Sequence, residues 1–149
     1  MSTEGLDPKS YRIGRFAGSV TAWSEAARSG AKKMSLSSPF SPVDYNLLLP
    51  YVKKATEDNQ VRFLLEKNFM TTDLFADVEM GDNWVFIVFK EENVVEDYFA
   101  LKTEKEHLEK EGKYVGETRK RIAREMGRLL GYSDHYIDER MNRVAFHII

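Results

Sequence analysis

The sequence predicts an α+β fold in which a three-stranded antiparallel sheet packs with helices from both ends of the chain. Three observations support this prediction. Both ends of the chain have helical periodicity, apolar or alternating runs occupy about residues 74–101, and short polar turns separate these runs. Because strands that follow one another through short turns pair side by side, we expect an antiparallel meander within 74–101.

Composition limits the possible classes of protein. The chain has 149 residues, of which 42% are hydrophobic and 31% charged, so we expect one domain over 1–149, with 1–6 disordered. It contains no cysteine, which excludes disulfides and thiolate chemistry and fits a reducing compartment. The sequence has neither a signal-peptide pattern nor an apolar run long enough to cross a bilayer, so we expect a cytoplasmic protein without a membrane partner.

The N-terminal region predicts one long helix. Asp7 and Pro8 form a start signal, because an aspartate caps free amides and proline fits the first helical position. The predicted helix runs to about Ala31. Its apolar stripe repeats at steps of three and four residues and contains Ile13, Phe16, Val20, Trp23, Ala27 and Gly30. Residues 32–41, rich in serine and proline, predict a loop.

Two further helices are expected before the sheet. Ser41-Pro42-Val43-Asp44 repeats the start signal, and the short helix that follows is expected to end at Leu49, since Pro50 disfavours helical geometry in the residue before it. A second helix is expected over 60–68, with Val61, Leu64 and Leu65 facing inward.

The expected sheet has three strands. Leu74, Ala76, Val78 and Met80 alternate along the first, and Gly81-Asp82-Asn83 offers a turn. Residues 84–89 are apolar on both faces, which predicts a central strand covered on both sides. Residues 94–101 are rich in β-forming side chains and predict the third strand.

The C-terminal third predicts three helices. The first starts at the capping-box pattern Thr103–Glu106 and ends near Gly112, and the second covers about 117–130. Ser133 is expected to cap the last helix. Its inward stripe contains Ile137, Met141, Val144 and Ile148.

The region from Arg119 to Arg143 has helix-turn-helix spacing, with Gly127 small where two helices would cross and Gly131 at the turn. Residues 134–139, which start the second helix, include three acids that would repel phosphates. We therefore expect an ordinary helical hairpin and keep a nucleic-acid-binding regulator as an alternative. Basic residues of the first helix form a candidate patch for an anion or a nucleic acid, although such side chains usually form surface ion pairs: Arg119, Lys120, Arg121, Arg124 and Arg128.

One group of residues suggests metal-assisted or acid/base chemistry. His135 and Glu139 lie one helical turn apart, and Asp138 is beside them, so nitrogen and oxygen ligands could converge. Nothing in the sequence supplies the remaining ligands, and such a pair is usually a surface salt bridge. A small enzyme using these residues is a second alternative. The sequence contains no nucleophile elbow or phosphate loop, so we expect no cofactor and single out no catalytic residue.

The preferred functional hypothesis is a non-enzymatic protein that acts by association, either as a homodimer or with another protein. Apolar segments lie near the two ends of the chain, where a lone domain would fray, and they need a covering surface. The candidate interface residues in these segments are Phe16, Val20, Trp23, Phe146 and Ile148.

Overall fold

The computed structural model describes residues 7–75 and 80–148, without the side chains of Phe75 and of residues 143–148. The expected disorder of residues 1–6 therefore lies outside the described residues. In chain order, the main elements are α1 (Pro8–Ser29), β1 (Met34–Leu36), α2 (Tyr45–Asp58), β2 (Arg62–Glu66), β3 (Val85–Phe89), α3 (Glu92–Lys110), α4 (Gly116–Leu129) and α5 (Asp134–Ile148). Short 3-10 turns occupy Pro42–Asp44 and Asp73–Phe75.

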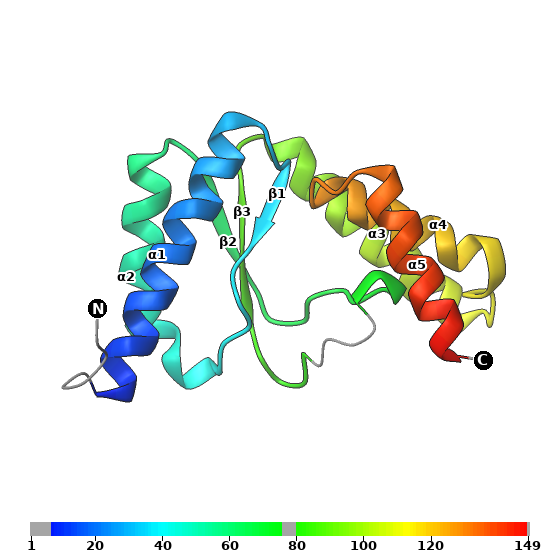
Figure 1. The fold of residues 1–149 in the computed structure, drawn as a ribbon, viewed down its shortest axis with the longest axis horizontal. Coiled ribbons are helices and arrows are strands. Elements are labelled where there is room, and N and C mark those ends of the chain that lie inside the picture. Colours follow the sequence, from blue (N-terminus) through cyan, green and yellow to red (C-terminus); the bar gives the residue numbers. More distant parts are fainter. Residues whose placement is uncertain (1–6, 76–79, 149) are drawn as a thin grey trace.

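The three strands form one antiparallel sheet in the order β1-β3-β2. This confirms the predicted α+β class and the three-stranded antiparallel sheet. It also confirms the central strand, because all five residues of β3 are buried and β3 lies between the other two strands. Helices cover both faces of the sheet (Figure 1).

The prediction of a meander confined to 74–101 is wrong, because both outer strands come from earlier in the chain. Residues 94–101 belong to α3, in which Val94, Tyr98 and Leu101 are buried at helical steps of four and three. That helical stripe packs into the core and overrides the β preference of the individual residues. Of the expected first strand, Leu74 lies in a 3-10 turn, and residues 76–79 lie outside the described part of the chain.

Other expected elements also differ. The predicted helix over 60–68 is β2 instead, because Gln60 has a φ of 55° that ends α2 and reverses the chain. The predicted 32–41 loop contains β1. The helix expected to end before Pro50 continues through it to Asp58, since the last turns of α2 bury Val52 and Ala55. Thr103 starts no helix, because α3 runs unbroken from Glu92.

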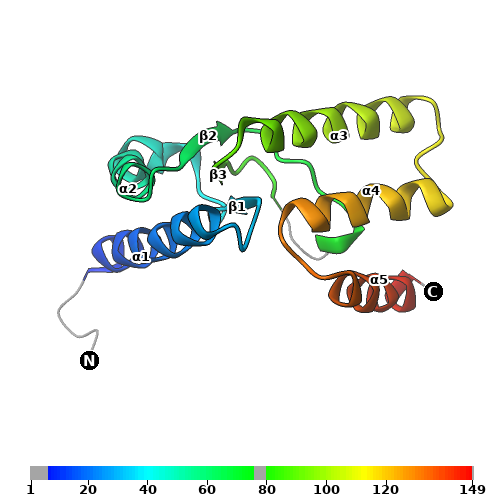
Figure 2. The same ribbon diagram turned by 90° about the horizontal axis from the view of Figure 1, so that it is seen from above.

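The sheet separates two layers of helices. On one face Phe63 and Phe86 pack with residues of α1 and α2, and on the other Met34 and Ile87 pack with residues of α3 and α4. Figure 2 shows α1 and α2 on one side of the strands and the α3–α4 hairpin on the other. Neighbouring residues of β3 thus contribute to two cores, as expected for a strand covered on both faces.

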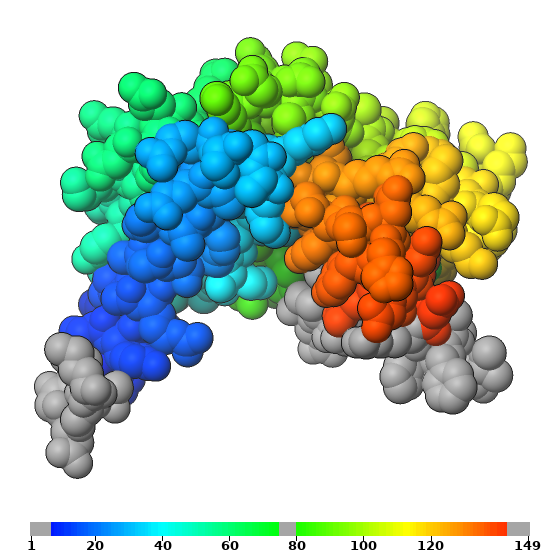
Figure 3. Space-filling view, turned by 45° about the horizontal axis from the view of Figure 1, so that its top comes forward, coloured from blue at the N-terminus to red at the C-terminus, as the bar shows by residue number. Residues whose placement is uncertain are grey.

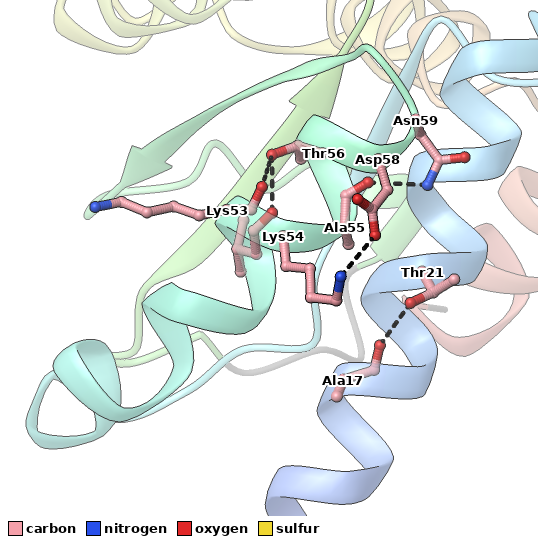
Figure 4. Close-up of polar contacts among 9 residues, drawn as sticks. Ala17, Thr21, Lys53, Lys54, Ala55, Thr56, Asp58 and Asn59 are labelled. Atoms are coloured by element: carbon pink, nitrogen blue, oxygen red, sulfur yellow. Dashed lines mark hydrogen bonds and ion pairs between the residues drawn. The ribbon is translucent and has the colours of Figure 1, made fainter.

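The N-terminal layer follows local capping signals. As predicted, Asp7 caps α1, its Oδ1 accepting a hydrogen bond from the Ser10 amide at 2.8 Å. Gly30, which was expected on the apolar stripe of a helix running to about Ala31, instead ends the helix with a φ of 81°. The end of α2 is closed by Thr56 and Asn59, whose side chains donate to the Val52 and Ala55 carbonyls at 2.8 and 2.9 Å (Figure 4).

The last two helices, α4 and α5, follow the predicted pattern, although the side chains of Val144 and Ile148 lie outside the described part of the molecule. Ser133 caps α5 by accepting a hydrogen bond from the Tyr136 amide, and Ile137 and Met141 are buried. Gly127 lies where α4 and α5 cross: a Cβ there would be 2.7 Å from Ile137 Cδ1.

Among the described residues no helix is both long and apolar enough to span a membrane. In the space-filling view, α1 and the α4–α5 pair form two lobes of the molecule (Figure 3).

Candidate interaction surface

Strand β2 forms one edge of the sheet, on the side away from β1 and between α2 and the start of α3 (Figure 2). It pairs with β3 along its whole length, from Arg62 opposite Phe89 to Glu66 opposite Val85. We call the side of residues 62–66 that faces away from β3 the β2 edge.

The backbone groups on the β2 edge can be assigned from the ladder. Both backbone groups of Phe86 face the β1 side, because its amide donates to Ser37 Oγ and its carbonyl accepts from the Ser37 amide, each at 2.9 Å. Because backbone groups alternate along an antiparallel strand, Ile87 faces β2 and bonds to Leu64. The amides and carbonyls of Phe63 and Leu65 therefore point outward. Within residues 7–75 and 80–148, no hydrogen bond reaches them.

The side chains of β2 give this edge little protection against pairing. Its three central residues, Phe63, Leu64 and Leu65, are apolar and only half-buried, and β2 contains no proline. Sheet edges are usually protected by short length, proline, lysine or a bulge. The opposite edge has such features, since β1 spans only three residues and Pro39 follows it closely. Of the two edges, β2 is therefore the better template for another strand.

A buried polar cluster fixes the end of β2. The Glu66 carboxylate, which is 9% exposed, accepts hydrogen bonds from the Tyr98 hydroxyl and the Lys102 ammonium, both at 2.9 Å. The Tyr98 hydroxyl also accepts a bond from the Met70 amide at 3.0 Å. Lys102 lies near the ring of Phe99, which is 40% exposed on α3. The cluster thus joins β2 to α3 and leaves an exposed aromatic ring close to the edge.

Burial raises the pKa of the Tyr98 hydroxyl above its ordinary value, and the Glu66 carboxylate raises it further, against the opposing effect of the Met70 amide. Burial raises the pKa of Tyr114 and Tyr132 as well. A phenol with a raised pKa in the folded state contributes stability that is complete below the unfolded value, about 10, and is lost as the pH rises further. Each of these tyrosines should therefore lower the stability as the pH rises above that value. The effect should be steepest for Tyr98, which is fully buried, at no more than about 1.4 kcal/mol per pH unit.

We expect this loss to appear in urea unfolding measured at a series of pH values above neutrality. The Tyr98→Phe variant should have a lower stability at neutral pH, because it loses two hydrogen bonds, but its stability should fall less steeply in alkali than that of the wild type. Equal slopes for the two proteins would show that Tyr98 does not resist ionisation. The comparison of slopes removes the cost of the lost hydrogen bonds from the measurement.

Every member of the predicted basic patch lies beside a carboxylate. Arg119 donates two 2.6 Å hydrogen bonds to Asp73, and the Asp73 carboxylate raises the pKa of this guanidinium. The other pairs join α4 to itself, to α3 or to α5: Lys120–Glu117, Arg121–Glu104, Arg121–Glu125, Arg124–Asp138 and Arg128–Asp134. The acids at the start of α5 thus lie against the basic face of α4.

The predicted metal-binding residues lie on the first turns of α5. His135, Asp138 and Glu139 are exposed, and Asp138 is paired with Arg124 at 3.3 Å. Within the described residues no three histidine, aspartate or glutamate side chains gather in an arrangement that could hold a metal ion. Arg140, on the same helix, donates a hydrogen bond to the Leu74 carbonyl at 3.0 Å.

The predicted interface residues of α1 are covered by the chain itself. Val20 is fully buried, and Phe16 and Trp23 pack partly buried against the same cluster. The Phe16 ring meets those of Phe40 and Phe86 edge to face, with centroids 6.2 Å apart in each case. The apolar stripe of α1 is therefore part of the core of this chain and does not need a partner to cover it. The side chains of Phe146 and Ile148 lie outside the described part of the molecule.

Comparison with known proteins identified no similar protein. The chain matches no protein-family model, no curated protein and no solved structure.

The sequence analysis missed the β2 edge because it assigned 60–68 to a helix. A signal was present: Phe63, Leu64 and Leu65 form a short apolar run after Asn59-Gln60, and such a run fits a strand as well as a helix.

Proposed function

We propose that this protein is a cytoplasmic, non-enzymatic association protein that forms a homodimer through the β2 edge. The observation that supports this most directly is that the backbone amides and carbonyls of Phe63 and Leu65 point outward. They belong to a strand with an apolar centre, and this strand has no proline to prevent another strand from pairing with it. A second copy of the same strand offers the same groups. Antiparallel pairing of two such edges joins two three-stranded sheets into one continuous sheet of about six strands.

The pairing has a defined register. A two-fold axis opposite Leu64 brings Phe63 against Leu65 of the second copy, so that the outward amides and carbonyls bond reciprocally. The same register sets Arg62 opposite Glu66 of the second copy. Within its own chain Arg62 lies 3.7 Å from Glu92, and Glu66 is paired with Lys102, so the register depends on the backbone groups and not on this charge pair. Leu64 then faces its own counterpart.

The first test is the mass of the protein in solution. At micromolar concentration, light scattering coupled to size exclusion should give twice the chain mass of 17.3 kDa. Leu64→Lys places two ammonium groups opposite each other in this register and should yield a monomer. Leu36→Lys is the matched control, because Leu36 is a half-buried leucine packed on the same core cluster but lies in β1. A monomeric wild type, or equal dissociation by the two variants, overturns the proposal.

Amide hydrogen exchange provides a second, residue-level test. In a monomer the Leu64 amide is protected by β3, whereas the amides of Phe63 and Leu65 face solvent and exchange fast. In the proposed dimer all three amides are protected, and the protection of Phe63 and Leu65 should rise with protein concentration. Fast exchange at these two residues in a protein that has the dimer mass would place the interface elsewhere.

A further inference from the structure

A cavity of about 400 Å³ lies between the first half of α1, the segment 38–41 and the start of α2. None of its lining residues belongs to β2, so it is separate from the proposed dimer surface. Its volume falls within the roughly 300–1,000 Å³ that is typical of sites for small molecules. In Figure 1 this region is the lower end of the α1–α2 pair.

The floor of the cavity is apolar. Phe40 and Leu48, which line it, are 7% and 6% exposed, and Phe16 packs against the same core cluster. These side chains belong to three different segments of the chain, so the floor is held by the core of the N-terminal layer. The apolar part of a ligand bound there would leave water and contact apolar side chains, which favours binding.

The rim of the cavity carries positive charge. Arg12 and Arg15 lie one turn apart on α1, and Asp44 is the single carboxylate among the described residues of the lining. Asp44 is 3.5 Å from Arg12. Arg15 lies 5.8 Å from the ring of Tyr11, and within residues 7–75 and 80–148 no carboxylate pairs with it. The rim therefore has two guanidinium groups and one acid.

The chemistry of the rim selects for an anion. Guanidinium groups bind carboxylates and phosphates through two parallel hydrogen bonds. Three serines, Ser19, Ser38 and Ser41, also line the cavity. Among the described residues that line the cavity, Arg15 is the cation without a carboxylate partner. It is thus placed to meet a negative head group whose apolar body lies on the floor.

We propose that this cavity binds a small amphipathic anion, with its apolar part on Phe16, Phe40 and Leu48 and its carboxylate or phosphate at Arg15. The role of Asp44 is to hold Arg12 at the rim and to leave Arg15 for the ligand. This proposal does not depend on the proposed dimer. Ligand binding can be found in a monomer, and a dimer can form without ligand binding.

The test uses decanoate and decyl phosphate below their micellar concentrations, with decanol as the uncharged control, in competition with the fluorescent probe anilinonaphthalene sulfonate. We expect saturable binding of one decyl anion per chain, and binding of decanol weaker by about ten- to a hundredfold, because decanol makes no charge-assisted hydrogen bond. The ratio between the two anions tells which head group the rim prefers. Equal affinity for decanol and decanoate, or no saturable binding at millimolar concentration, overturns the proposal.

Two variants locate the binding. Arg15→Gln should weaken decanoate by about ten- to a hundredfold, whereas Arg28→Gln, an exposed arginine of the same helix outside the cavity lining, should leave the affinity unchanged. Leu47→Trp adds bulk at a half-buried lining position without changing charge and should also abolish binding. Unchanged circular dichroism and melting temperature exclude misfolding as the cause. Wild-type affinity in both Arg15→Gln and Leu47→Trp would place the ligand elsewhere.

Discussion

We expect the Phe86→Ala substitution to lower the free energy of unfolding by about 3–5 kcal/mol, the usual cost of removing a buried aromatic ring from a core. Phe86 is 0% exposed in the centre of β3. Its ring stacks on Phe40 at a centroid distance of 4.9 Å and meets Tyr45 and Phe63, each at 5.9 Å. Because these neighbours belong to three separate segments, they cannot all move inward to fill the space.

Urea unfolding followed by circular dichroism measures this cost, at one protein concentration for all variants. Tyr51→Ala is the matched control, since Tyr51 is also an aromatic residue but is 39% exposed on α2. We expect the control to cost under about 1 kcal/mol, as for other surface positions. Similar losses for the two variants would mean that the aromatic cluster around Phe86 is not the core of the N-terminal layer.

The parts of the fold that the sequence predicted are those with local causes. The start of α1 at Asp7 and Pro8 and the cap at Ser133 depend on neighbours within one turn. The small residue at Gly127 depends on Ile137 of the helix that follows directly in the chain. The central strand 85–89 was also predictable, because five consecutive apolar residues indicate burial on both faces.

The outer strands depend on distant residues and could not be predicted in the same way. Met34 pairs with Phe89, and Leu65 pairs with Phe86, so each strand is defined by a partner more than twenty residues away. A short apolar run that fits helix or strand takes its structure from such a partner. The stretch 94–101 shows the reverse case, in which β-forming residues are helical because one face packs into the core.

The same limit applies to the candidate sites. Whether a strand lies at an edge depends on the order of the sheet, and whether an arginine is free depends on which carboxylate the fold places beside it. Arg119 is paired with Asp73, 46 positions earlier in the chain, whereas Arg15 has no such neighbour in the described residues. The chemical types of these residues were evident from the sequence, but their pairing was not.

Lys102→Met is expected to lower the free energy of unfolding by about 3 kcal/mol, because it leaves the Glu66 carboxylate buried without its cation. The Lys102 and Glu66 side chains are 16% and 9% exposed, so water replaces the lost ammonium poorly. Tyr98 and the Asn68 amide still donate hydrogen bonds to Glu66, which keeps the cost at the lower end of the range for buried pairs. Lys110→Met, an exposed lysine of the same helix, should cost less than about 0.5 kcal/mol.

A double-mutant cycle separates the charge effect from the loss of packing. In the Glu66→Gln background the buried group is neutral, so we expect Lys102→Met to cost only about 1 kcal/mol, which corresponds to a coupling of about 2 kcal/mol between the two side chains. Urea unfolding of the four proteins gives this coupling directly. If Lys102→Met costs the same in both backgrounds, the ammonium stabilises the fold through its hydrocarbon stem, and the junction of β2 with α3 is held by Tyr98 and the surrounding apolar contacts instead.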